Sequence, residues 1–187
     1  MAIDKTEIER LTEVHGGVWG INHTRRLLHL VEQIGGNLEY DREAIWIAAH
    51  LHDWGAYAPW AQKGVDHVVR SLQVAEEHLM AKGCSPELKV LVLECIALHH
   101  KPGSDRSLEA TLLRDADCLD FLGIVGVLRD FSKNPRGLRA AFDQARERRN
   151  TVPQLLQLKA SRAIARKRVR EMDALLEQFE TESVGCF

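Results

Sequence analysis

The chain has 187 residues, of which 45% are hydrophobic and 28% are charged. This composition suits a globular protein with a sizeable core, built as one domain or as one domain with a helical extension. The formal net charge of -2 provides no overall field that would attract nucleic acid or an anionic membrane. No apolar run approaches the roughly 20 residues of a membrane span.

The four cysteines form no CxxC pair, and no signal peptide precedes them. Disulfides are rare in reducing compartments. The cysteine pattern therefore predicts reduced thiols and a cytoplasmic location.

Helical periodicity begins near the N-terminus, where residues 1–14 are expected to form a first helix. Residues 21–36 repeat apolar side chains at steps of three and four and end at a glycine pair. Asp41 is expected to cap a helix over residues 42–53. Gly55, Pro59 and Gly64 then indicate a loop over residues 54–65.

Further helices are expected over about residues 66–82, 86–100 and 107–119, the last of these either ending there or continuing to 129. Pro102 and Gly103 separate the second from the third. The run 121-FLGIVGVL-128 favours a buried helix over a strand, and two more helices are expected near 136–149 and 153–180. The predicted fold is all-α: a single helical bundle, with C-terminal helices over residues 131–187 packing on it.

Two stretches of the C-terminal part, residues 136–149 and 162–170, are rich in arginine and lysine. The favoured interpretation is a solvated helix face. A partner surface or a dimer interface is the alternative.

Histidines and carboxylates near the apolar faces of five predicted helices form a candidate metal site. A helical bundle projects side chains from facing helices into its core, so residues far apart in sequence can converge there. Imidazole and carboxylate without thiolate disfavour structural zinc and suit Mn, Fe, Ni, Co, Mg or open-site Zn. The candidates are His23, His52, Asp53, His67, His99, His100, Asp115, Asp117 and Asp120.

Helix geometry limits which of these candidates can act together. Neighbouring helical residues point about 100° apart, so His52 and Asp53 can share an ion only where their helix ends or bends. Trp54 and Gly55 predict such an end. Asp115 and Asp117 point about 200° apart, so they cannot both face one site.

Five stretches carry a more specific signal, namely 22-NHTRRLL-28, 50-HLHDWG-55, 66-DHVVRS-71, 96-IALHH-100 and 109-EATLLRDADCLDFLGIVGVLR-129. In this order they resemble the motifs of the HD-domain metal-dependent phosphohydrolase superfamily. The last stretch closely resembles the Asp-Ala-Asp-x-Leu-Asp segment of small, stand-alone bacterial members. The resemblance covers about residues 15 to 130 and implies an HD-domain core over that range.

The resemblance also implies roles for individual residues. It implies one or two divalent ions per chain, held first by His23, His52, Asp53 and Asp117. It implies that His67 and His99 complete a second metal site or contact substrate phosphate. His99 rather than His100 fits the Ile-x-x-His spacing from Ile96. His100 is therefore expected beside the site or in solvent.

Other residues are expected to act on the substrate. Arg26 and Lys63 are candidate catalytic contacts to phosphate, and Asp53 is also a candidate acceptor of the proton from the attacking water. Tyr57 and Trp60, in the loop after the His-Asp pair, are expected to line the pocket.

The function implied by the resemblance is metal-dependent hydrolysis of a phosphoester or phosphoanhydride bond in a small molecule such as a nucleotide. Such a protein is expected to act as a monomer or homodimer, without nucleic-acid or membrane partners. One alternative is an HD-fold two-iron oxygenase or a C–N hydrolase or hydratase. The stretch 54-WGAY-57 lacks the additional His of such oxygenases, which favours the hydrolase. A second alternative is a non-catalytic metal-binding module.

Overall fold

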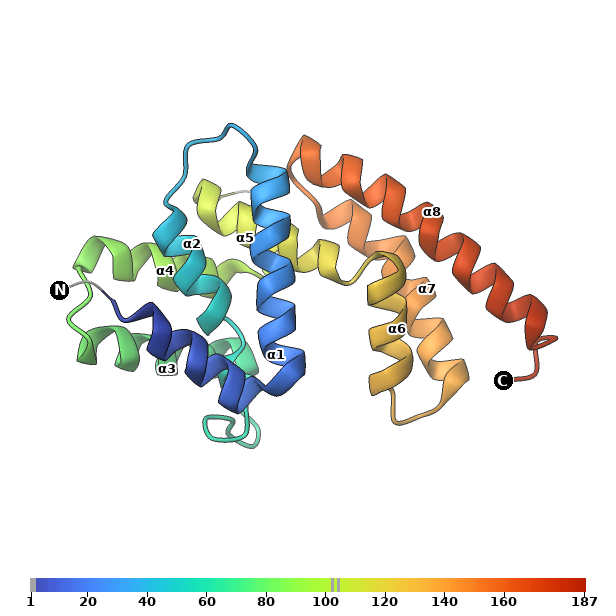
Figure 1. The fold of residues 1–187 in the computed structure, drawn as a ribbon, viewed down its shortest axis with the longest axis horizontal. Coiled ribbons are helices and arrows are strands. Elements are labelled where there is room, and N and C mark those ends of the chain that lie inside the picture. The colour runs from blue at the N-terminus through green and yellow to red at the C-terminus, as the bar shows by residue number, and fades with distance from the viewer. Residues whose placement is uncertain (1–2, 102, 104) are drawn as a thin grey trace. The chain divides into compact units, whose positions relative to one another are not determined.

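A computed structural model describes residues 3–101, 103 and 105–187 of the chain. These described residues form eight α-helices and one short 3-10 helix, with no strand, so the predicted all-α fold class is confirmed. The chain divides into two compact units, Met1–Arg114 and Asp115–Phe187, and each is described by itself (Figure 1). Pro102 and the first two residues of the expected N-terminal helix lie outside the described residues.

The first unit contains α1 (Lys5–Gly35), α2 (Arg42–Leu51), the 3-10 helix η1 (Trp54–Ala56), α3 (His67–Ala81), α4 (Pro86–Leu98) and the beginning of α5 (Leu108–Asp120). Helix α2 packs against α1 and α4, while α3 packs against α4 and η1. Helix α1 is interrupted at Gly17, which has a φ of 59° and separates an N-terminal segment from the helix that carries His23.

Local capping explains where the helices of the first unit begin. The side chains of Asp4, Asp41, Asp66 and Ser85 each accept hydrogen bonds from backbone N–H groups in the first turn of α1, α2, α3 and α4. An unpaired N–H group at a helix start is thereby satisfied. Between these starts, apolar side chains with no more than 2% exposure form the core, among them Leu27, Ile45, Ile47, Leu79 and Ile96.

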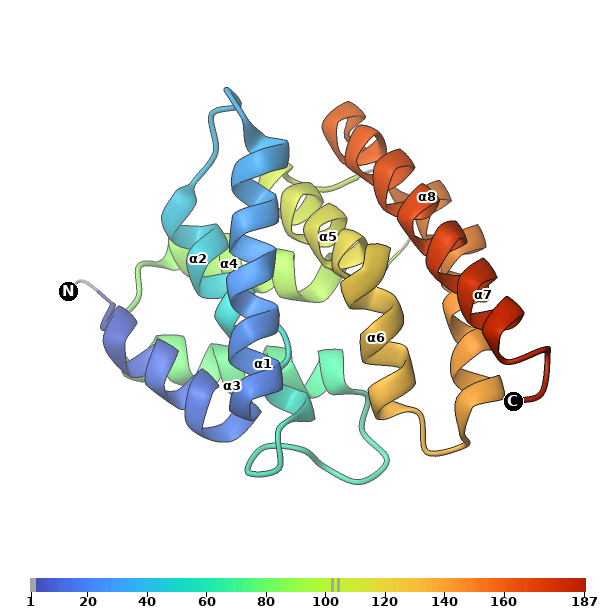
Figure 2. The same cartoon turned by 45° about the vertical axis from the view of Figure 1, so that its right-hand side comes forward.

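The second unit contains the end of α5, followed by α6 (Gly123–Lys133), α7 (Leu138–Leu155) and α8 (Lys159–Glu182). Helix α6 packs against both α7 and α8, and α7 against α8 (Figure 2). Val127, Phe142 and Met172 contribute buried side chains from the three helices. The run 121–128 is helical from Gly123 onward, as the sequence favours.

The last two helices begin and end at other places than the sequence suggests. Pro153 does not start the final helix: it lies inside α7, and the break comes at Leu156–Leu158. The buried carboxylate of Asp115 accepts hydrogen bonds from the N–H groups of Gln157 and Leu158, at 3.1 and 2.8 Å. This carboxylate thereby anchors the two residues directly before α8, where the N-cap position is Leu158 and no side chain caps the first turn.

Helix α5 ends at Asp120 and does not continue to residue 129, because Phe121 and Leu122 leave the helix and Gly123 has a φ of 81°. The expected division near residue 130, with the C-terminal helices packed on the core, stays a prediction. Among the described residues, no helix is both long and apolar enough to cross a membrane.

Candidate metal centre

The pair His52–Asp53 lies directly after the end of α2. Helix α2 stops at Leu51, His52 occupies its C-cap, and Asp53 has left helical geometry with a φ of -106° and a ψ of 4°. The two side chains are therefore released from the 100° separation of neighbours within a helix. Asp53 Oδ2 lies 3.4 Å from His52 Nε2, so both can face one point.

His23 reaches the same point from α1. Its Nε2 atom lies 3.2 Å from His52 Nε2 and 3.9 Å from Asp53 Oδ2. Both histidines are buried, whereas the Asp53 side chain is 29% exposed. The first unit thus contains a group of three potential metal ligands, open on the side of the carboxylate.

The arrangement of ring nitrogens fits a divalent ion. His52 Nδ1 lies 2.9 Å from the carbonyl oxygen of Ala49, which can only accept, so Nδ1 carries a hydrogen and Nε2 is the ring atom available to an ion. Two nitrogens bound to one ion at about 2.1 Å would lie roughly 3.0–3.4 Å apart. The 3.2 Å between the two Nε2 atoms falls in this range.

A second group of potential ligands consists of His67, His99 and His100, with ligand atoms within 4.8 Å of one another. His67 is the first residue of α3, and the other two directly follow the end of α4 at Leu98. His99 Nδ1 lies 2.6 Å from the carbonyl oxygen of Ile96, which fixes its ring as Ala49 fixes that of His52.

Asp53 lies between the two groups. Its Oδ2 atom faces His23 and His52, while its Oδ1 atom lies 3.9 Å from His67 Nε2. The ring of His99 also lies edge-on to that of His52, with centroids 5.2 Å apart. The two groups therefore form one continuous cluster of five imidazoles, of which His23, His52 and His67 lie within 3.9 Å of the Asp53 carboxylate. This composition suits one ion or two.

Gly55 sets the distance between the His52–Asp53 turn and α3. Its N–H group donates to Ser71 Oγ at 2.9 Å, and a Cβ atom at this position would lie 2.4 Å from the His67 carbonyl oxygen. The backbone of the turn can approach α3 this closely only without a side chain. Trp54 anchors the same turn, because it is buried and its indole N–H donates to Thr12 Oγ1 at 2.9 Å.

Tyr57 and Trp60 belong to the aromatic packing beside the turn. The Trp60 ring stacks on Trp54 with centroids 4.4 Å apart, and the Tyr57 ring lies against Gly16 and Gly20 of α1. Burial raises the pKa of the Tyr57 hydroxyl, and the nearby charge of Asp53 raises it further. Tyr57 therefore keeps its proton at neutral pH and presents a hydrogen-bond donor.

The remaining candidate residues lie in different places. Arg26 is half-buried on α1, three residues after His23, and Lys63 is exposed in the loop before α3. Asp117 lies on α5 in the second unit, so its expected role as a fourth ligand stays a prediction. Asp115 is engaged with the start of α8, and Asp120 forms an ion pair with Arg129 of α6.

His100 belongs to the second group and has an exposed side chain, so its expected place beside the site or in solvent stays a prediction. Its ring centroid lies 4.1 Å from that of His99 and 5.1 Å from that of His67. The sequence predicts a helix end near this His-His pair, and a helix end permits both rings to point the same way. Motif spacing favoured His99 alone.

Comparisons with known proteins identify the family and the fold. The family model of the HD domain matches residues 20–122. A predicted HD superfamily hydrolase from an uncultured Thermotogales bacterium shares 25% identity with a TM-score of 0.68, over 95% of this chain and 90% of that chain. An HD-superfamily hydrolase from Bacillus thuringiensis shares 23% identity with a TM-score of 0.71, over 95% and 93% of the two chains.

A third crystal structure is that of Bacillus subtilis YpgQ in complex with ADP, which is 20% identical with a TM-score of 0.74, over 96% of this chain and 97% of that chain. Because the Bacillus thuringiensis hydrolase and YpgQ are each less than 25% identical to this chain, their similarity shows the fold alone. No curated protein matches the chain by sequence.

Proposed function

Because the chain belongs to the HD domain family, we propose that it is a metal-dependent phosphohydrolase acting on a small phosphorylated molecule. The observation that carries the proposal is the cluster of five imidazoles that includes Asp53. The Nε2 atoms of His23 and His52 lie 3.2 Å apart, and the Asp53 side chain is 29% exposed. A divalent ion bound there would polarise a phosphoryl oxygen and lower the pKa of a water molecule towards neutrality.

The ligands proposed for the first ion are His23, His52, Asp53 and Asp117. His67 and His99, together with His100, are proposed to hold a second ion or to contact the phosphate directly. Both roles suit an imidazole such as that of His99, whose Nδ1 atom is held by the carbonyl oxygen of Ile96. Asp53 faces both groups, and we propose that it accepts the proton of the attacking water.

Charge that develops on the phosphoryl oxygens needs donors. Arg26, from α1, and Lys63, from the exposed loop, are proposed to supply two of them. The neutral hydroxyl of Tyr57 is proposed to orient the substrate beside Asp53, with Trp60 forming part of the pocket wall. Nucleotides are the first substrates to test, because YpgQ, which shares the fold, was crystallised with ADP.

The test is phosphate release over a panel of nucleotides, sugar phosphates and simple phosphoesters. The protein is stripped of metal, and Mn²⁺, Mg²⁺, Co²⁺ or Ni²⁺ is restored singly. Asp53→Ala is the test variant, and Glu77→Ala, an exposed acid on α3, is the matched control. Release that needs both the metal and Asp53, and that Glu77→Ala retains, supports the proposal.

A silent panel with metal still bound would refute the phosphohydrolase. Oxygen consumption with Fe²⁺ would then decide for the oxygenase alternative. Metal binding itself is read separately by thermal unfolding, where chelation should lower the midpoint of the control but not that of Asp53→Ala.

A further inference from the structure

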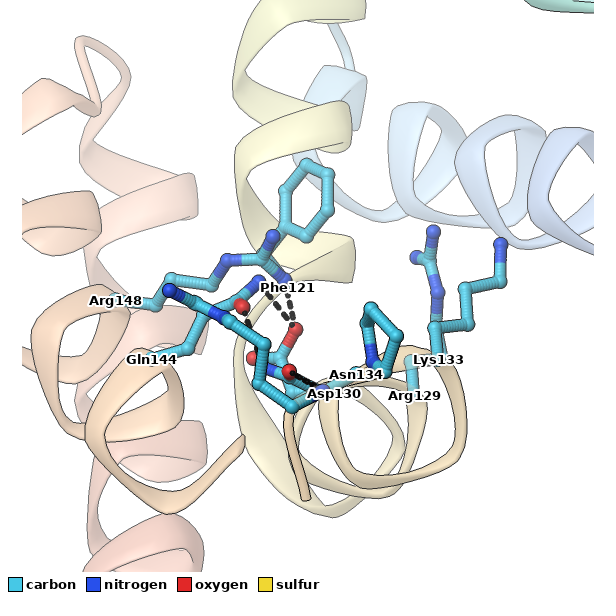
Figure 3. A pocket seen from close by; sticks show the side chains of 9 residues that line it. Phe121, Arg129, Asp130, Lys133, Asn134, Gln144 and Arg148 are labelled. Carbon is cyan, nitrogen blue, oxygen red and sulfur yellow. Dashed lines mark hydrogen bonds and ion pairs between the residues drawn. The ribbon is translucent and has the colours of Figure 1, made fainter. Parts of the chain in front are cut away.

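A second concentration of charged side chains lies wholly within the second unit, around the turn from α6 to α7 (Figure 3). It lines a pocket of about 290 Å³. Four of the lining side chains are cationic and one is acidic: Arg129, Lys133, Arg136, Arg148 and Asp130. No residue of the imidazole cluster belongs to it, and the proposed hydrolysis gives it no role.

Two of the cationic groups are held in place by buried carboxylates. Arg148 Nη1 lies 2.5 Å from Asp130 Oδ1, and Arg129 forms an ion pair with Asp120. The two carboxylate side chains are 4% and 1% exposed, whereas the guanidinium side chains of Arg148 and Arg129 are 27% and 13% exposed. Each guanidinium carries five N–H donors, more than a single carboxylate can accept.

Phe121 gives both arginines a common support. The guanidinium carbons of Arg148 and Arg129 lie 4.3 and 5.1 Å from the centroid of its ring. Contact with an aromatic face restricts the otherwise mobile arginine side chain. The two guanidinium groups are therefore preorganised before any ligand arrives, which reduces the entropy cost of binding.

The turn between the helices is fixed as well. Asn134 Oδ1 accepts the backbone N–H of Arg136 at 3.0 Å, and Asn134 Nδ2 donates to Gln144 Oε1 at 3.1 Å. Gln144 in turn donates to Asp130 Oδ1 at 3.1 Å, as the dashed lines of Figure 3 show. This network holds the exposed side chains of Lys133 and Arg136 at either end of the turn.

Charge balance indicates what the pocket binds. The lining contains four cationic side chains and one acidic side chain, and Asp120 adds a second carboxylate beside Arg129. The surrounding residues 129–170 contain thirteen Arg or Lys and only three Asp or Glu, so the local field favours an anion. Guanidinium forks match the oxygen spacing of a tetrahedral phosphate, and lysine adds a point charge.

We propose that this pocket binds a phosphate dianion, either free or as the terminal group of a phosphorylated small molecule. The pocket lies entirely within the second unit and shares no residue with the imidazole cluster. It gives the basic stretch 136–149 a function beyond that of a solvated helix face.

Calorimetric titration of the full chain with inorganic phosphate, at constant ionic strength in a chloride buffer, tests the proposal. The test variant is Lys133→Gln combined with Arg136→Gln, since both side chains are exposed and their loss leaves the two buried ion pairs intact. The matched control is Lys159→Gln combined with Lys167→Gln, which removes the same charge from exposed positions of α8. Circular dichroism verifies that both variants fold.

The expected result is that the test variant binds phosphate at least about tenfold more weakly, while the control binds within about twofold of the native chain. The same titration in Asp53→Ala should leave phosphate affinity unchanged. A titration of Asp53→Ala with glycerol phosphate separates the two sources of the anion. If glycerol phosphate binds as tightly as inorganic phosphate or more tightly, the ligand is a phosphorylated molecule; if it binds much more weakly, the ligand is free phosphate.

Three outcomes would overturn the proposal: no detectable binding of either anion, equal binding by the test variant and its control, or binding that disappears in Asp53→Ala. The last would place the anion at the imidazole cluster. Because the readout is binding and not turnover, failure here is distinguishable from failure of the proposed hydrolase.

Discussion

Replacement of Gly55 by alanine tests whether the close approach of the His52–Asp53 turn to α3 builds the imidazole cluster. The added Cβ atom would lie 2.3 Å from the Ser71 backbone nitrogen and 2.4 Å from the His67 carbonyl oxygen. Ordinary contacts of this kind lie at 3.4–4 Å. Both obstacles are backbone atoms, so a rotamer change cannot relieve them.

The turn and α3 must therefore separate by roughly 1 Å, and overpacking of this kind costs about 1–3 kcal/mol. The separation also weakens the hydrogen bond from Gly55 N to Ser71 Oγ. More specifically, it moves His67, the first residue of α3, away from Asp53. Misplacement of about 1 Å in a reacting constellation can reduce the rate about a hundredfold.

The assays are urea unfolding and metal-dependent phosphate release on the same preparations. Ala56→Ser is the control, because it adds one atom at the next residue, whose side chain is exposed. We expect Gly55→Ala to lose both stability and activity, and the control to lose neither. If Gly55→Ala has the same urea midpoint of unfolding and the same rate of phosphate release as the native chain, the inference that this glycine positions the cluster is wrong.

Two further predictions concern stability. Asp115→Ala should lower the free energy of unfolding by about 1–3 kcal/mol in urea titration, since it leaves the N–H groups of Gln157 and Leu158 without their acceptor. Asp143→Ala, which replaces an exposed acid on α7, should cost little, and equal losses would contradict the anchoring role of Asp115. Burial lowers the pKa of His78 below its usual 6.5, so the unfolded chain binds the proton more readily and stability should fall as the pH drops through 6.5. With a chelator present, His78→Gln should lose less of its free energy of unfolding between pH 7.5 and 5.5 than the native chain does. A pH profile equal to that of the native chain would refute this.

Much of the first unit can be predicted from the sequence because its helix starts are determined locally. Asp41 and Ser85 each lie within three residues of the N–H groups that they accept from, so the cap and the helix appear in one short stretch. The glycine pair after residue 34 and the loop from Gly55 to Gly64 likewise mark helix ends by their own backbone preferences. Local signals of this kind survive without knowledge of the tertiary structure.

The start of α8 could not be predicted in the same way. The two residues before it, Gln157 and Leu158, are held by Asp115, more than forty residues earlier in the chain, and its N-cap position is a leucine without a capping side chain. Pro153 gave the only local signal, and it was misleading because α7 continues past it. Asp115 had appeared as a possible metal ligand, and only its contact with residues 157 and 158 reveals its structural role.

The imidazole cluster illustrates how a helical protein brings adjacent residues to one point. Within a helix, His52 and Asp53 would diverge by about 100°, as would His99 and His100. The chain avoids this divergence twice by the same means: α2 ends at Leu51 and α4 at Leu98, each directly before its pair. In both cases the ring Nδ1 of the first histidine donates to the carbonyl oxygen three residues earlier: His52 to Ala49, and His99 to Ile96. In a continuing helix, this carbonyl oxygen would instead accept the backbone N–H of the residue four positions later. The helix end thus supplies both the change of direction and the acceptor that orients the imidazole. A dipeptide of ligands at a helix end is for this reason a stronger signal than the same dipeptide within a helix.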